Sequence, residues 1–255
     1  HCDPKGRMHA NFYLHCAASD HYLLQLPIAV VSTALAALNK YAVFSKATLT
    51  DLSAQYAAFG FANIQCDPET PDTFARITTG SIGSVQWIKR TDIDNFLNSL
   101  EPLEAQWCGS AAWEYRLITA GISFVQPQTV GEFIPQMFNL DYLGGISFTK
   151  GCYMGQETIA RMKYRGGNKR ALYIVSGTVT APLTNESQLE IALEDDEGFR
   201  RAGTIIEAVQ RGEQVLLTAV LANDTQLDAK LRVAADAGSE LSLIALPYSL
   251  EEQDS

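Results

Sequence analysis

The stretch Lys150-Gly-Cys-Tyr-Met-Gly-Gln-Glu157 carries more structural information than any other part of the chain. Its two glycines allow the backbone to turn tightly, and Gln156-Glu157 then opens an apolar-periodic helix. We therefore expect Cys152 at or just before a helix N-terminus, where unpaired N–H groups and the helix dipole favour a thiolate. Glu157 also has an explanation without function, because a carboxylate is favourable in the first turn of any helix.

This motif begins the most cationic segment of the chain. Lys150 to Arg170 contains six basic side chains and one acidic side chain, a net charge of +5 in a chain of formal net charge −10. Because like charges repel, a chance cluster of cations is unfavourable, and we expect this segment to face an anion. A solvated helix face with i,i+4 spacing is the alternative interpretation. The overall acidity argues against coating nucleic acid or an anionic membrane with the whole surface.

Upstream of the motif, strand and helix signals alternate. Pro27–Tyr41 predicts a helix, because proline is favoured at a helix start and apolar residues recur on one face. Thr91–Leu100 predicts a second helix, with Thr91 as its N-cap. Strands are expected at Met8–Cys16, Tyr22–Leu26, Ala47–Leu52, Gln55–Phe59, Phe74–Ile77 and Val85–Lys89. This mixture indicates an α+β sandwich of the ferredoxin-like kind.

Just before the motif the sequence predicts one more helix, and after it the sequence predicts strands. A helix is expected over Gly109–Ala120, ended by Gly121. From Arg170 onward, short apolar runs are separated by turn residues, which is typical of a small antiparallel barrel or sandwich. The runs are Leu172–Val175, Leu189–Leu193, Thr204–Val209, Val215–Val220 and Leu241–Leu246. A domain boundary is expected near Gly166-Gly167.

The cysteine pattern and the hydropathy of the chain indicate in which compartment the protein is found. Five scattered cysteines without CxxC pairs fit a reducing compartment, so we expect a cytoplasmic protein. The longest apolar run, Leu23 to Leu38, falls short of the ~20 residues that cross a bilayer, which predicts no membrane span. The histidines and cysteines near the N-terminus follow no zinc spacing, so no metal site is expected. A monomer is expected, because no heptad pattern is present.

Further segments extend the motif into a recognisable signature. Lys150–Glu157 is followed by Ala160-Arg161, Arg165-Gly166 and Asn168-Lys169-Arg170. This pattern resembles the signature of the YgfZ proteins, which are folate-binding relatives of the glycine-cleavage aminomethyltransferase. The resemblance spans essentially the whole chain, and other similar segments are His1-Cys2-Asp3, Lys40–Lys46, Phe133–Gln136, Leu143–Phe148 and Leu246–Glu252.

The resemblance implies an aminomethyltransferase-like, multidomain α+β architecture around a central cavity. Residues 1–106 would form the ferredoxin-like domain, and residues 107–166 the C-terminal part of the folate-binding domain. Residues 167–255 would form a C-terminal antiparallel β-barrel. YgfZ proteins carry a further N-terminal stretch that supplies part of the folate-binding domain, and we expect that stretch to be absent here.

The resemblance also implies folate or tetrahydrofolate as the ligand. A pterin edge offers an N–H and an amino group side by side, which a carboxylate accepts with bidentate geometry while an amide reads the neighbouring groups. Gln156 and Glu157 are predicted to supply these groups, although both also suit a helix start. The anionic glutamyl tail would meet a cation. The candidates for that role are Arg161, Lys163 and Arg165.

Two other residues owe their predicted roles to the resemblance. It points to Trp113 as the aromatic wall on which the pterin stacks, whereas composition alone would equally allow a core tryptophan. Cys152 by itself would more often be a small buried hydrophobe. Because this cysteine belongs to the family signature, we expect a functional thiol instead.

Two functions compete. The resemblance implies a folate-dependent accessory protein that maintains certain iron–sulfur enzymes and, through them, tRNA modification. The alternative is a folate-dependent aminomethyl or formyl transferase, which needs a positioned acid/base carboxylate that Tyr22–Pro27 does not offer. We therefore favour the accessory role, with an iron–sulfur enzyme or assembly protein as partner. The tRNA link is expected to be indirect, because only Lys150–Arg170 is suited to phosphates.

Overall fold

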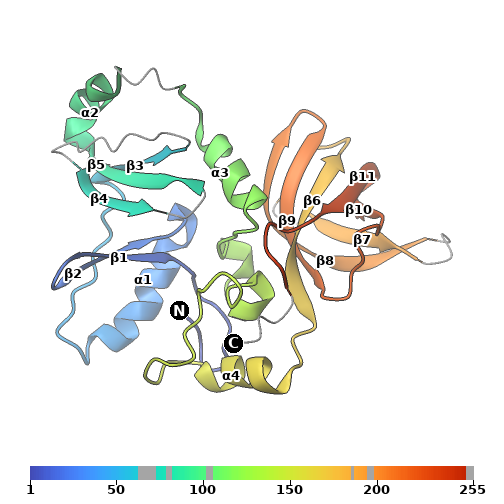
Figure 1. The fold of residues 1–255 in the computed structure, drawn as a ribbon, viewed down its shortest axis with the longest axis horizontal. Coiled ribbons are helices and arrows are strands. Elements are labelled where there is room, and N and C mark those ends of the chain that lie inside the picture. The colour runs from blue at the N-terminus through green and yellow to red at the C-terminus, as the bar shows by residue number, and fades with distance from the viewer. Residues whose placement is uncertain (63–72, 79–81, 102–105, 185–186, 194–197, 251–255) are drawn as a thin grey trace. The chain divides into compact units, whose positions relative to one another are not determined.

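The computed structural model describes residues 1–62, 73–78, 82–101, 106–184, 187–193 and 198–250. The chain folds into two compact units, one of Phe12–Trp113 and one that joins His1–Asn11 to Glu114–Ser255 (Figure 1). The predicted domain boundaries after residues 106 and 166 stay a prediction, because this division into units does not test them.

The unit Phe12–Trp113 mixes helices and strands, as the α+β prediction requires. Its elements are β1 (Tyr13–Ala18), β2 (His21–Gln25), α1 (Ile28–Ala42), β3 (Tyr56–Phe61), β4 (Thr73–Thr78), β5 (Ser84–Lys89), η2 (Arg90–Asp92) and α2 (Ile93–Leu100). β1 and β2 form a hairpin, and the other strands pair antiparallel in the order β3-β5-β4. α1 confirms the predicted helix and buries Val30, Ala34 and Ala37.

Three local predictions in this region are wrong. Ala47–Leu52 is not a strand, and Asp51 instead accepts a hydrogen bond from the Ser53 amide at 2.8 Å, a turn that competes with strand pairing. The predicted strand Met8–Cys16 begins only at Tyr13, because Met8 pairs with Cys2 in an isolated bridge. Thr91 does not cap α2, since its hydroxyl donates to the Asp92 carboxylate at 3.0 Å.

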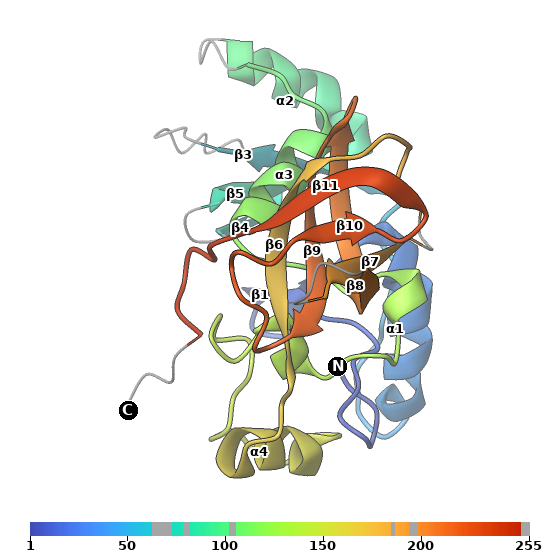
Figure 2. The ribbon, with the colours of Figure 1, turned by 90° about the vertical axis from the view of Figure 1, so that its right-hand side faces the viewer.

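The C-terminal strands close into a barrel, which decides between the two predicted alternatives. The strands are β6 (Arg170–Thr178), β7 (Gln188–Ala192), β8 (Phe199–Arg211), β9 (Gln214–Ala222), β10 (Leu231–Val233) and β11 (Asp236–Ile244), in the closed order β10-β11-β6-β9-β8-β7 (Figure 2). On β9, Leu217 and Ala219 fill the barrel, whereas Val220 packs outside it with Leu172 and Ile159. Alternation of side chains along each strand thus builds an interior and a buried outer wall.

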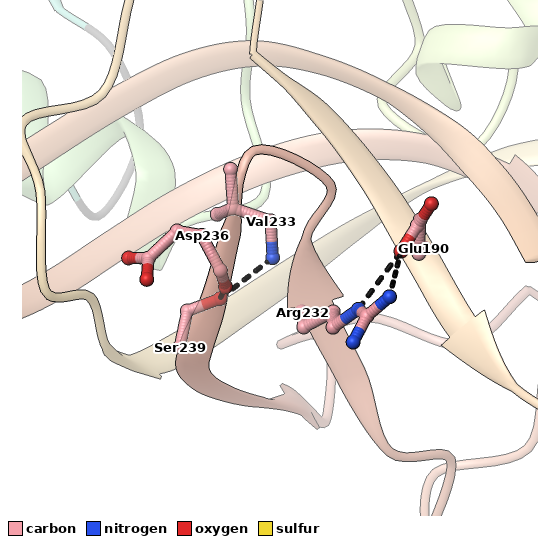
Figure 3. A network of polar contacts seen from close by, with 5 residues as sticks. All are labelled: Glu190, Arg232, Val233, Asp236 and Ser239. Atoms are coloured by element: carbon pink, nitrogen blue, oxygen red, sulfur yellow. Dashed lines mark hydrogen bonds and ion pairs between the residues drawn. The ribbon is translucent and has the colours of Figure 1, made fainter. Parts of the chain in front are cut away.

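The short strand β10 was missed by sequence reasoning, because three residues show no alternation. Side chains hold it in the barrel (Figure 3). The Arg232 guanidinium contacts the Glu190 carboxylate of β7 through two nitrogens at 2.8 and 2.7 Å, and it lies 4.0 Å from the centroid of the Phe199 ring. The Val233 amide donates to the Ser239 hydroxyl at 2.8 Å. These side-chain contacts supplement the few backbone hydrogen bonds that a strand of three residues can form with its neighbours.

The helical segments that precede the barrel in the chain include α3 (Ser110–Thr119), the 3-10 turn η5 (Pro135–Phe138) and α4 (Gln156–Arg165). α3 confirms the predicted helix, and Gly121, at φ +65°, ends it as expected. After η5, the Asn139 side chain pairs with both backbone groups of Leu172 at 2.9 and 3.2 Å, which fixes this segment to β6. Within the described ranges, no helix has the length and apolar composition of a membrane span.

Candidate functional site

Helix α4 begins at a glycine that the N-terminal segment contacts directly. Gly155 is the N-cap residue at φ +79°, and a Cβ on it would lie 2.6 Å from the Asp3 carbonyl oxygen and 2.7 Å from Gly6 Cα. The Asp3 carboxylate shapes this segment by accepting hydrogen bonds from the amides of Lys5 and Arg7, both at 2.8 Å. The second glycine of the motif therefore permits both a left-handed turn and close backbone packing.

The inner face of α4 is anchored by apolar and polar contacts. Ile159 is 1% exposed and packs in one cluster with Cys2 and Tyr153. The buried Gln136 side chain of η5 donates to the Ile159 carbonyl oxygen at 2.7 Å. The Gln156 side-chain oxygen accepts a hydrogen bond from the Tyr153 backbone amide at 3.0 Å, so this oxygen already has one partner at the helix start.

Cys152 lies farther from the helix than expected. It precedes the N-cap Gly155 by three residues, so it lies outside the first turn, within which a helix dipole acts. Its thiol is free and exposed, which contradicts the interpretation as a buried small hydrophobe. Cys2 contrasts with it, because burial raises the pKa of that thiol. Among the described residues, no group of three or more His, Cys, Asp or Glu side chains is arranged to hold a metal ion.

The charged residues of α4 divide between its faces. Glu157, Arg161 and Arg165 are exposed, and they form no ion pair with any residue that the structure describes. Glu157 and Arg161 have the i,i+4 spacing without an ion pair between them, and their exposure is compatible with the alternative interpretation as a solvated helix face. Lys163 is partly buried near Asp141. Burial raises the pKa of the Asp141 carboxyl, and the charge of Lys163 opposes that shift.

Trp113 is half-buried on α3 and is not sealed in a core. Its indole lies on the backbone of β3, where a Cβ on Gly60 would approach Trp113 Cε3 to 2.4 Å. One ring face is therefore occupied by the glycine, and only the other is suited to stack a ligand. Trp113 belongs to the unit Phe12–Trp113, whereas α4 belongs to the other unit. Their convergence on one folate site stays a prediction.

Gly60→Ala is expected to displace the Trp113 indole. The added methyl overlaps three ring atoms at 2.4 to 2.9 Å, so the ring must turn away from β3, at a cost of about 1–3 kcal/mol of unfolding free energy. Near-UV circular dichroism and urea denaturation measure the two effects. Gly109→Ala is the matched control, because no atom lies within 4 Å of its added methyl. An unchanged near-UV spectrum for Gly60→Ala would show that the indole does not lie there.

Sequence reasoning missed Glu207, a carboxyl on β8. Its two oxygens accept hydrogen bonds from the Phe124 amide at 3.3 Å and from the Gln126 side chain at 2.8 Å. Burial raises the pKa of Glu207 to about 7, and the charge of Glu114 adds to the shift, although hydrogen bonds from Ser123, Phe124 and Gln126 oppose it. A glutamate within an alternating strand resembles an ordinary solvent-facing residue, so the sequence carries no signal for this site.

The architecture defines the class of protein. The structure is similar to that of the glycine cleavage system aminomethyltransferase T from Bartonella henselae, with a TM-score of 0.63 over 96% of this chain and 73% of that one. The sequence identity is 13%, so this similarity concerns the fold alone. The chain therefore has an aminomethyltransferase-like fold with a C-terminal barrel.

Sequence comparison identifies the family. Residues 168–236 match the YgfZ β-barrel domain model. The chain is 37% identical to tRNA-modifying protein YgfZ of Enterobacter sp. (strain 638) and 36% identical to that of Klebsiella pneumoniae (strain 342). Each alignment covers 99% of this chain and 81% of the relative. The chain belongs to the YgfZ family, as the motif around Cys152 predicts.

Proposed function

We propose that this chain binds tetrahydrofolate and acts as an accessory protein for iron–sulfur enzymes and, through them, for tRNA modification. Membership of a family of tRNA-modifying proteins supports the coarser part of this role. The observation that carries the folate proposal is the donor set on α4. Glu157 supplies a carboxylate and Arg161 and Arg165 supply guanidiniums that are exposed and unpaired among the described residues, all within ten residues of one helix.

The chemistry of these residues fits the ligand. The Glu157 carboxylate is available to accept the N–H and amino group of a pterin edge in bidentate geometry. The Gln156 oxygen already accepts one hydrogen bond from Tyr153, and the NH₂ of this side chain is available as a donor to a ring acceptor. Trp113 would stack through the ring face opposite Gly60. Arg161, Lys163 or Arg165 would hold the glutamyl tail.

In this proposal the protein residues bind and orient the ligand, and bound tetrahydrofolate supplies the capacity to carry one-carbon units. The exposed Cys152 thiol would be available to a partner, which we propose is an iron–sulfur enzyme or an assembly protein. The free cysteines support a reducing, cytoplasmic location. A net charge of −10 disfavours extended contact with RNA, which supports an indirect link to tRNA.

The test is a titration of the full chain with unsubstituted, methylene- and formyl-tetrahydrofolate. Trp113→Ala and Glu157→Gln are each expected to weaken binding by about 10-fold or more, because a stacking face or a bidentate acceptor is lost. Trp107→Ala is the matched control, since this tryptophan is 59% exposed. Equal affinity of the Trp113 variant and the unaltered protein would contradict the site. Loss of the one-carbon unit during incubation would support the transferase instead of the accessory role.

A further inference from the structure

The outward face of α4 carries an exposed aromatic ring and two exposed arginines. We call Arg161, Tyr164 and Arg165 the basic α4 face. Tyr164 is 71% exposed, yet its ring meets the ring of Phe148 edge to face, with centroids 5.9 Å apart. Phe148 in turn packs against the buried cluster that contains Ile159. The tyrosine is thus held in position while most of its surface remains open.

The arginines of this face form no ion pair with the residues that the structure describes. The chain contains 29 acidic residues, yet neither Arg161 nor Arg165 has an acidic partner within 4 Å in the part that the structure describes. Lys169 and Arg170 extend the positive charge toward β6, and both are exposed. The views of Figures 1 and 2 show α4 at the end of β6 and beyond the strands of the barrel. The face is therefore open to a partner.

We propose that the basic α4 face binds an acidic segment of a partner protein. Arginine and tyrosine are enriched among residues that dominate binding energy at protein interfaces. A guanidinium binds a carboxylate through two parallel hydrogen bonds. Arg161 and Arg165 are one helical turn apart, ~6 Å along the axis, which matches carboxylates on one face of a short helix or on alternate residues of a strand.

Charge complementarity favours an acidic peptide over RNA. The segment from Lys150 to Arg170 carries +5, so the other residues of this −10 chain together carry −15. A long polyanion would extend past the face and be repelled by that charge, whereas a short acidic segment would be bound by the face alone. The inference rests on the proposed function for the kind of partner, an iron–sulfur enzyme or assembly protein, and it shares Arg161 and Arg165 with the residues proposed to hold the glutamyl tail. Tyr164 is not among the residues predicted to bind folate.

The test uses the full chain and a fluorescent synthetic peptide of alternating glutamate and serine with one central leucine. The unaltered protein is expected to bind this peptide, and its affinity is expected to fall as the salt concentration rises. The same peptide with glutamine in place of glutamate is expected not to bind. The double variant Arg161→Gln, Arg165→Gln and the single variant Tyr164→Ala are each expected to weaken binding by about 10-fold or more. Arg200→Gln with Arg201→Gln is the matched control, because these two arginines are exposed on β8.

The outcomes separate this inference from the folate proposal. Tyr164→Ala is expected to bind tetrahydrofolate like the unaltered protein while losing the peptide. Peptide binding without folate binding would overturn only the proposed function. Unchanged peptide affinity in both α4 variants, or no peptide binding by the unaltered protein, would overturn the docking surface. Tighter binding of an oligouridylate of equal length would assign the face to RNA, which also overturns the proposal. Thermal unfolding of each variant checks that it is folded.

Discussion

Glu207→Gln is expected to stabilise the protein at about pH 8 and to leave its stability nearly unchanged below pH 4.5. The pKa of Glu207 is raised from 4.5 to about 7 in the folded protein, mainly by burial. Between these values the unfolded chain releases a proton that the folded chain keeps, so the free energy of unfolding falls as pH rises. Above pH 7 the folded carboxyl is ionised as well, and the loss stays constant at about 3 kcal/mol.

The amide variant removes this pH dependence and keeps the shape of the site. The Gln126 side chain can turn its amide, so that its oxygen accepts from the introduced NH₂ while the Phe124 amide keeps its acceptor. A gain of about 1–3 kcal/mol at pH 8 is therefore expected, because the cost of ionising a buried carboxyl disappears. Urea denaturation across the pH range measures it.

Two further variants make the result specific to Glu207. Glu213→Gln changes an exposed glutamate at the β8–β9 turn and is expected to leave the pH dependence unaltered. Glu114→Gln removes the neighbouring charge that raises the pKa of Glu207, so the fall in stability should end at a lower pH. If Glu207→Gln retains the full fall in stability between pH 4.5 and pH 7, the carboxyl is not the group responsible.

Gly155→Ala is expected to lower the free energy of unfolding by about 2–4 kcal/mol, because two separate costs add. A side chain is strained at φ +79°, and the new methyl would overlap backbone atoms of Asp3 and Gly6, which cannot turn aside like a side chain. The N-terminal segment should separate from α4 as a result. Faster tryptic cleavage after Lys5 and Arg7 would report that separation, alongside urea denaturation of the whole protein.

Other glycines separate the two costs. Gly131 has φ +74° with no atom within 4 Å of an added methyl, so Gly131→Ala should show the conformational cost alone, about 1–2 kcal/mol. Gly151 has neither a left-handed φ nor a close neighbour, and Gly151→Ala should be nearly neutral. If Gly155→Ala is no more destabilising than Gly131→Ala, the contact between α4 and the N-terminal segment does not contribute to stability.

Local sequence signals predicted most of the elements that surround the site. Proline at position 27 and apolar periodicity predicted α1, and Gly121 predicted the end of α3. The alternating apolar runs predicted the longer barrel strands. Failures occurred where a local pattern competed with a turn, as at Asp51, or was too short to be read, as in β10. The signals that succeeded involve residues only a few positions apart, so they depend on local chemistry alone.

By itself, the sequence determined the family, the turn and helix of the motif, and the placement of cations on α4. Only the tertiary structure decided how these residues are used. Gly155 meets Asp3 and Gly6, the Trp113 indole lies on Gly60, and the Glu207 carboxyl is enclosed by a segment more than 80 positions away along the chain. Steric contact and desolvation depend on which distant residues come together, and no local pattern encodes that information.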